Sequence, residues 1–325
     1  MSEDPRSYAR RSTATVAAFA ALAASFATQA ENVVGLTSTN ALVSFDSSTP
    51  WQASNPLNIT GLLGANERIL GLDLRPSTGL LYGLGSAGNV YTLDAGTGAA
   101  TFVAALTANP TDTSNPYSGL RGSAYGVDFN PVPDLGQALP SFRVTSNAGE
   151  NLRINVNAAG AGSTFTDGAL NIPAGGMPTI AASAYSNNDR DANTATMLYG
   201  IDVASDTLYV QAPPNDGTLV AVGHLGVDTT GVAGFDISGA SGAAYAALND
   251  GLTGKSALYS IDLANGMASK LGDFGIGGNT AIAAPLLGLT VAPIPEPGTY
   301  AMMLAGLLGV ALVAHRRSAA VRPEG

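Results

Sequence analysis

The side chains best suited to chemistry in this sequence of 325 residues are carboxylates, and one short stretch holds several of them. The segment SNNDRDANT places Asp189, Asp191 and Asn193 at alternate positions, which is the spacing of the first oxygen ligands in a calcium-binding loop. Such a loop has glycine at its sixth position and glutamate at its twelfth, where this sequence has Thr194 and Gly200. We therefore interpret the segment as a polar hairpin tip and keep a calcium site as the alternative.

Three other aspartates occupy equivalent places in similar short segments. Asp73 lies in LGLDLRP, Asp128 in YGVDFNP and Asp236 in AGFDISG. If these segments are inner strands of a ring, the carboxylates could meet near a central channel and bind a cation, or perform acid–base chemistry if crowding raises a pKa. A related segment, LGLTVAP, has Thr290 at the same place. The interpretation we favour is local: each aspartate accepts N–H bonds from the turn after its strand.

Other catalytic chemistry finds little support in the residue types present. The sequence has no cysteine and two histidines, and His224, the one outside the C-terminal tail, is not accompanied by a G-x-S-x-G nucleophile motif. GLGSAG at residues 83–88 is formally a dinucleotide-binding motif, but a strand pattern follows it instead of a helix, so we expect a hairpin turn. We predict no catalytic residues, no cofactor-binding residues and no enzyme activity, with calcium as the one cofactor left open.

A repeat organises these segments. Their glycines are Gly71, Gly126, Gly234 and Gly288, at intervals of 55, 108 and 54 residues, so one copy near residue 180 is degenerate. Each unit contains about four strand patterns, which in the clearest unit are ILGLDL, GLLYGLG, NVYTLD and AATFVAAL. A four-stranded unit repeated at such an interval is typical of a β-propeller.

The two ends of the repeat predict how the ring closes. The first unit starts at residue 32 without a leading strand, and the last leading strand, residues 287–293, has no strands after it. Joined, the two fragments make one complete blade and leave no open edge. We therefore predict an all-β fold, a propeller of five four-stranded blades closed by pairing of the N-terminal strands with the strand at 287–293. An open β-sandwich is the alternative.

The N-terminal segment is typical of a secretory signal peptide. A basic stretch that includes Arg10 and Arg11 precedes the apolar run TATVAAFAALAASFA, and a small residue, Ala30, ends the segment before Glu31. We predict a signal helix over residues 1–30, export by the general secretory route, and cleavage between Ala30 and Glu31.

The C-terminal segment has three parts in order. They are the motif Pro295, Glu296 and Pro297, an uncharged run at residues 300–314, and the pair Arg316 and Arg317. As a helix the run would span about 22 Å, short of the ~30 Å hydrocarbon core, so it is a marginal permanent anchor. The arginines after it predict a cytoplasmic tail, residues 318–325, with the body of the protein outside. We expect a transmembrane helix that associates with the membrane transiently.

These three parts together resemble the PEP-CTERM sorting signal of Gram-negative bacteria, over residues 294–317. The resemblance implies recognition by an exosortase-type membrane protease that removes the tail. A plain single-pass anchor after a proline-rich linker is the alternative interpretation.

Residues 31–293 resemble the DUF4394 family, a bacterial domain of unknown function. The segments that carry the resemblance include LRPSTGLLYGLGSAGNVYTLDAGTGAATFV, GVDFNPVPD, NLRINVNAAG and GFDISG. The resemblance implies a propeller-like fold and secretion, and it supplies no activity or catalytic residues. The segment DLGQALPS, residues 134–141, departs from the pattern and is expected to lengthen one hairpin.

Charge and organisation point to a role at the cell surface. The formal net charge of −10 argues against nucleic-acid partners, because an acidic body repels phosphate backbones. We expect an exported, non-enzymatic scaffold or binding module of a Gram-negative cell surface or extracellular matrix, first tethered to the inner membrane, with exopolysaccharide or surface proteins as partners. The alternative is a carbohydrate-active enzyme, or a calcium- or glycan-binding propeller, that uses carboxylates near the central channel.

Overall fold

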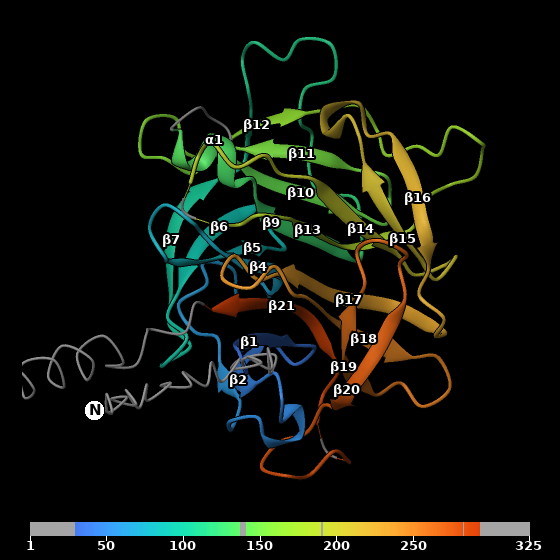
Figure 1. The fold of residues 1–325 in the computed structure, drawn as a ribbon. Coiled ribbons are helices and arrows are strands. Elements are labelled where there is room, and N and C mark those ends of the chain that lie inside the picture. Colours follow the sequence, from blue (N-terminus) through green and yellow to red (C-terminus); the bar gives the residue numbers. More distant parts are fainter. Residues whose placement is uncertain (1–29, 137–140, 190, 282, 293–325) are drawn as a thin grey trace, which may run out of the picture.

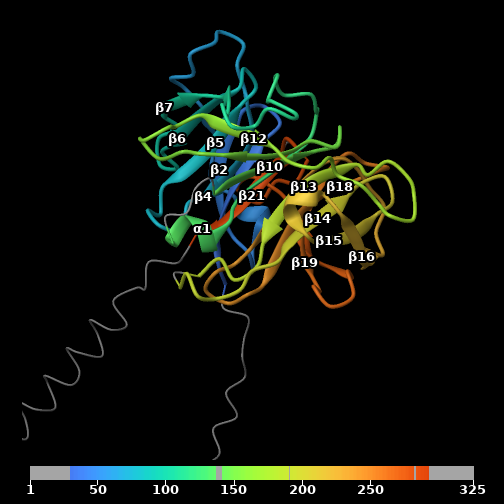
Figure 2. The ribbon, with the colours of Figure 1, turned by 90° about the horizontal axis from the view of Figure 1, so that it is seen from above.

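The structure is a computed structural model that describes residues 30–136, 141–189, 191–281 and 283–292. In this part of the chain, twenty-one strands form five sheets, which are arranged around a common axis as the blades of a propeller (Figures 1 and 2). The expected all-β fold with five blades is confirmed.

Each blade is described from the axis outward, beginning with the blade that joins the two chain ends. Blade 1 consists of β21 (Leu286–Ala292), β1 (Asn32–Thr37), β2 (Ala41–Asp46) and β3 (Leu57–Asn58). Blade 2 consists of β4 (Ile69–Leu74), β5 (Leu81–Gly85), β6 (Asn89–Leu93) and β7 (Ala100–Ala105). Blade 3 consists of β9 (Tyr125–Phe129), β10 (Phe142–Ser146), β11 (Asn151–Ile154) and β12 (Ser163–Thr166), with β8 (Thr107–Ala108) at its outer edge. Blade 4 consists of β13 (Ile180–Tyr185), β14 (Leu198–Asp202), β15 (Thr207–Gln211) and β16 (Leu219–His224). Blade 5 consists of β17 (Thr229–Ile237), β18 (Ala244–Asp250), β19 (Ser256–Ile261) and β20 (Ala268–Asp273).

Local turn chemistry explains why each repeat folds into a four-stranded meander. In blade 2 the Asp94 carboxylate accepts the N–H groups of Gly96 and Thr97, and Gly98 adopts a φ of +75°, so the chain reverses between β6 and β7. All five residues of β5 are buried, because neighbouring blades cover both faces of the sheet. The strand patterns expected between residues 69 and 106 are therefore confirmed.

Pairing between the two ends of the described chain closes the ring. Strand β1 runs antiparallel to β21, from Asn32 opposite Ala292 to Leu36 opposite Gly288. In Figure 1 the blue β1 lies beside the red-orange β21. This pairing confirms the predicted closure and leaves β21 as the inner strand of a complete blade.

Two features of blade 3 differ from a plain meander. A short helix, α1 (Pro131–Leu135), stands between β9 and β10, where the insertion at 134–141 was expected only to lengthen a hairpin. The Asn130 side chain caps this helix by accepting the Val132 N–H at 3.1 Å. The other feature is β8, which pairs in parallel with β12 although the two are far apart in the chain. Short 3-10 helices, η1 (Pro50–Gln52) and η2 (Pro214–Asp216), complete the elements of the described chain.

The expected helices at the chain ends fall outside the described residues. Residues 1–29 of the expected signal peptide and the run at 300–314 are not among them. Within the described ranges, no helix has the length and apolar character needed to cross a membrane.

Glycines allow the inner strands to approach one another closely at the axis. A Cβ atom added to Gly126 of β9 would lie 2.4 Å from the backbone nitrogen of Ser183 in β13. At Gly288 of β21, by contrast, an added Cβ would meet nothing nearer than 3.9 Å. The cavity left on the axis has a volume of about 10 Å³. The recurring glycines that reveal the repeat thus include positions where no side chain fits.

We expect Gly126→Ala to destabilise the propeller, because the new methyl group would overlap the backbone of the next blade. Overpacking of this kind costs about 1–3 kcal/mol, which chemical denaturation would measure as a lower unfolding midpoint. Gly288→Ala is the matched control at the same place in another inner strand, and it should be neutral or stabilising by about 0.4–1 kcal/mol. Equal losses in both variants would contradict the argument from close packing.

Candidate functional site

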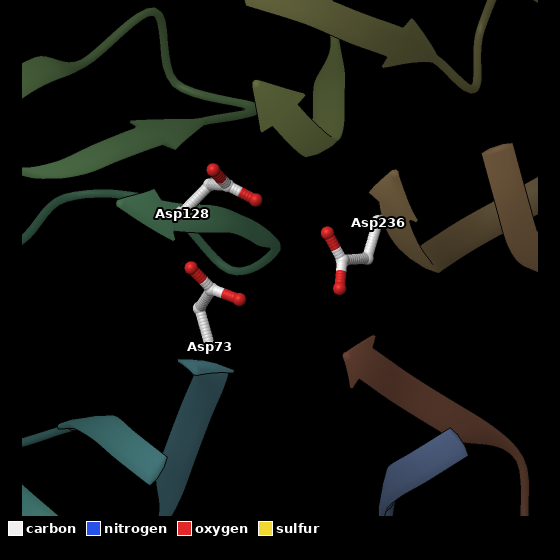
Figure 3. A group of neighbouring side chains, drawn as sticks. All are labelled: Asp73, Asp128 and Asp236. Atoms are coloured by element: carbon white, nitrogen blue, oxygen red, sulfur yellow. The ribbon is translucent and has the colours of Figure 1, made fainter. Parts of the chain in front are cut away.

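Three aspartates meet on the axis of the propeller. Asp73, Asp128 and Asp236 are the penultimate residues of β4, β9 and β17, and each is at most 2 % exposed. One oxygen of each carboxyl group lies within 4.8 Å of the corresponding oxygens of the other two. Figure 3 shows the three groups facing a common space. The sequence suggested that these carboxylates could converge, and the structure brings them together.

Each of the three carboxyl groups accepts a backbone N–H from the inner strand of the next blade. The bonds run from Phe129 N to Asp73 Oδ2 at 2.8 Å, from Tyr185 N to Asp128 Oδ1 at 3.1 Å, and from Val291 N to Asp236 Oδ2 at 2.6 Å. The local interpretation favoured from the sequence is therefore wrong in its main point, because each of these three bonds links one blade to the next. A local bond of the expected kind is also present in two cases. Asp73 accepts the N–H of Leu74, and Asp236 accepts the N–H of Ile237.

Thr290 of β21 connects two of the carboxyl groups. Its hydroxyl oxygen lies 3.0 Å from Asp73 Oδ1 and 2.9 Å from Asp236 Oδ2. A hydroxyl group has one proton, so it can donate to only one of these oxygens at a time. The contact between the hydroxyl oxygen and the second carboxyl oxygen is then favourable only if that carboxyl group carries a proton or a cation lies nearby. The closing strand is thus part of the cluster, although it carries no aspartate there.

Burial raises the pKa of all three carboxyl groups. Desolvation is the main cause and raises the pKa of Asp73 and Asp128 well above the usual value for aspartate. The charge of Asp236 raises the pKa of Asp73 further, and the charges of Asp73 and Asp236 do the same for Asp128. Desolvation also raises the pKa of Asp236 to about 6, against the N–H bond of Val291 and other donors that lower it. Three negative charges in this space therefore repel one another strongly.

Blade 4 has no carboxyl group at the corresponding place. Its inner strand β13 carries Ala184, which is fully buried, next to the Tyr185 N–H that bonds Asp128. This is the unit in which the sequence repeat was degenerate. The cluster therefore joins blades 2, 3, 5 and, through Thr290, blade 1.

The cluster lies between two hollows along the axis. On one side is the small axial cavity lined by residues that precede the aspartates in the same strands, including Gly71, Gly126 and Gly234. On the other side is a cavity of about 260 Å³, whose lining includes Leu74 and Val291. Because Leu74 directly follows Asp73 and Val291 directly follows Thr290, the larger cavity opens over the strand ends that carry the cluster.

Comparison with known proteins places this propeller in a family. The sequence profile described as a domain of unknown function, DUF4394, matches residues 41–284, which is most of the ring. The chain belongs to the DUF4394 family. No curated protein matches it.

Solved structures similar to this DUF4394 protein have low sequence identity. A nidogen/laminin complex matches at 12 % identity and a TM-score of 0.45, over 81 % of this chain and 98 % of that one. A protein of unknown function from Bacteroides thetaiotaomicron matches at 14 % identity and a TM-score of 0.44, over 81 % and 66 % of the two chains. TolB from Acinetobacter baumannii matches at 10 % identity and a TM-score of 0.41, over 81 % and 67 %.

The C-terminal segment of this DUF4394 protein also matches a known signal. The PEP-CTERM protein-sorting motif matches residues 293–317, which confirms the sorting signal expected at 294–317. Pro295, Glu296, Pro297, Arg316 and Arg317 lie within the match and outside the described residues. The motif indicates a secreted surface protein processed by exosortase.

The other predicted ligand set of the DUF4394 domain lies in the loop between β13 and β14, and Asp189 of this loop lines the larger cavity. Asp189 Oδ1 accepts the Asp191 N–H, and Asp191 Oδ1 accepts the Asn193 N–H, both at 2.9 Å. The hydrogen bonds that the Asn193 N–H and the Asn193 side chain donate to Asp191 lower the pKa of Asp191. Asp191 and Asn193 are exposed, as expected of a polar hairpin tip, and calcium binding by this loop stays a prediction.

The remaining residues considered for chemistry have structural surroundings in the DUF4394 fold. His224 ends β16, with its Nδ1 atom 3.1 Å from the Thr207 hydroxyl oxygen. In GLGSAG, Gly83 and Gly85 belong to β5, and Gly88 adopts a φ of +76° in the turn before β6. That segment is a hairpin, as expected.

Two buried arginines that the sequence analysis did not single out also connect blades. Arg75 donates from Nε to Asp134 of α1 at 2.7 Å, which joins blade 2 to blade 3. Arg143 of β10 pairs with Asp167 at 2.7 Å and bonds the Asn215 side chain near blade 4. No local pattern in the sequence reveals these partners. Asp134 is 59 residues from Arg75, and Asn215 is 72 residues from Arg143.

We expect Thr290→Val to lower the free energy of unfolding by about 1–3 kcal/mol. Valine keeps the volume of threonine but leaves the oxygens of Asp73 and Asp236 without their shared hydroxyl group. Chemical denaturation would measure the loss as a lower midpoint with an unchanged slope. Thr290→Ser keeps the hydroxyl group and should lose less. A valine variant as stable as the wild type would contradict the role given to Thr290.

Proposed function

We propose that this protein is a non-enzymatic propeller that acts at the cell surface or in the extracellular matrix as a scaffold or binding module. The observation that carries the proposal is the burial of its converging carboxylates. A general acid or base must come within hydrogen-bond reach of the substrate. Asp73, Asp128 and Asp236 are at most 2 % exposed, and an axial cavity of about 10 Å³ has space for about one water molecule. A sugar ring does not fit into that axial cavity.

The outer surface of the ring is then the place for recognition. The larger cavity, about 260 Å³, is below the roughly 300–1,000 Å³ of usual small-molecule sites. We therefore assign binding to the blade surfaces, with exopolysaccharide or surface proteins as partners. The acidic net charge of −10 disfavours nucleic acid in this role.

The proposed route to the surface uses both chain ends. The signal peptide, residues 1–30, directs general secretory export and is cleaved between Ala30 and Glu31. The run at 300–314 holds the precursor in the inner membrane of a Gram-negative bacterium, with residues 318–325 in the cytoplasm. An exosortase-type protease then removes the tail. The position of β21 supports this order, because the ring is complete at Ala292, just before the sorting motif begins.

The enzyme question can be tested with the secreted protein and a panel of bacterial polysaccharides. We expect retention of the protein on one or more polysaccharides and no release of reducing ends above that of a heat-denatured control. Hydrolysis by the wild type that falls by about 100-fold or more in Asp128→Asn would instead support the alternative, a carbohydrate-active enzyme.

The sorting route can be tested by mass spectrometry of the surface-exposed form in its own host. We expect peptides from the blades and none from beyond the Pro-Glu-Pro motif. Replacing Pro295 and Pro297 by alanine should cause the full-length precursor to accumulate in the membrane fraction. An intact C-terminal tail on the surface-exposed wild type would contradict processing.

A further inference from the structure

The negative charge of the axial cluster is not balanced by the described side chains around it. Three carboxyl groups share one buried space, and among the described residues no arginine or lysine forms an ion pair with any of them. Buried carboxylates are normally paired with a cation, bound to a metal or protonated. A ligand of positive charge would resolve the repulsion.

One oxygen in the cluster also lacks any partner. Asp128 is 1 % exposed, and its Oδ2 atom is buried with no hydrogen bond from the described residues, whereas Oδ1 accepts the Tyr185 N–H. Figure 3 shows this carboxyl group directed toward the space shared with Asp73 and Asp236. Buried polar atoms in native proteins nearly always have a partner. A buried carboxyl group that has an unpartnered oxygen and is directed toward two other carboxyl groups therefore favours a cation within the cluster.

We propose that Asp73, Asp128 and Asp236, together with the Thr290 hydroxyl oxygen, bind one calcium-type divalent cation on the propeller axis. The cation would hold the inner strands of blades 2, 3 and 5 to the closing strand β21. This site is distinct from the loop at Asp189, Asp191 and Asn193, and it does not depend on the partner that the blade surfaces recognise.

The ligand atoms favour a hard cation, and the available space favours calcium. Every ligand is an oxygen, which suits calcium or magnesium over softer metals. Calcium–oxygen distances of about 2.3–2.6 Å would place three evenly spaced ligands about 4.0–4.5 Å apart. That spacing is compatible with three oxygens that lie within 4.8 Å of one another. Magnesium demands near-ideal octahedral geometry at about 2.0–2.1 Å, which places its ligands closer together than calcium does.

Backbone N–H groups can stabilise the negative charge that remains on the three carboxylates when a divalent cation is bound. Three carboxylates and one divalent cation carry a net charge of −1, which five backbone N–H groups share. They come from Leu74, Phe129, Tyr185, Ile237 and Val291. These bonds hold the carboxyl groups in place before the ion binds, which limits the reorganisation that binding requires.

The test is elemental analysis and thermal unfolding of the secreted protein, purified without added metal. We expect about one calcium per chain, a melting temperature that falls in EGTA, and its recovery on adding calcium but not an equal concentration of magnesium. Asp128→Asn should bind calcium at least about tenfold more weakly, because it loses a charged ligand. If that variant does not fold, the metal content and the reversible response of the wild type still decide the question.

Asp191→Asn is the matched control, because it removes an aspartate from the exposed loop that also has ligand spacing. It should retain the calcium and the EGTA response of the wild type. Three results would each overturn the proposal: no metal and no EGTA response in the wild type, loss of calcium in Asp191→Asn, or magnesium in place of calcium. The first, with Asp128→Asn more stable than the wild type, would show that shared protons hold the carboxyl groups together.

Discussion

Strand β21 hydrogen-bonds to β1 along its length, and this pairing holds the first and last parts of the ring together. Without it, β1 and β21 would each present an unpaired edge, and an exposed edge is prone to pair with other chains. The pairing also sets the position of Thr290, which lies opposite Val34 and reaches two of the axial carboxyl groups. The strand pairing that closes the ring therefore also brings Thr290 into the axial cluster.

The axial aspartates illustrate how buried carboxyl groups can link the blades of a propeller. Each accepts the N–H of the next inner strand at a point where glycines bring the strands close. Hydrogen bonds to a charged acceptor contribute about 1.5–3 kcal/mol, which offsets part of the desolvation that burial imposes. Mutual repulsion remains, and a bound cation would convert it into an attraction shared by four blades.

The sorting signal and the folded domain occupy separate parts of this chain. The PEP-CTERM motif, which indicates the cellular destination, begins directly after the last strand of the ring. The described residues form the propeller, whose inner strands make close backbone contacts at the axis.

The sequence by itself determined the number of blades, the four strands of the clearest unit and the closure of the ring, because turn residues and strand alternation are local signals repeated along the chain. It also identified Asp73, Asp128 and Asp236 as equivalent positions. It did not reveal that each bonds the next blade, that Thr290 joins two of them, or that β8 pairs with β12. Those contacts link segments distant in the chain, so only the tertiary structure, which brings the five inner strands to one axis, decided them.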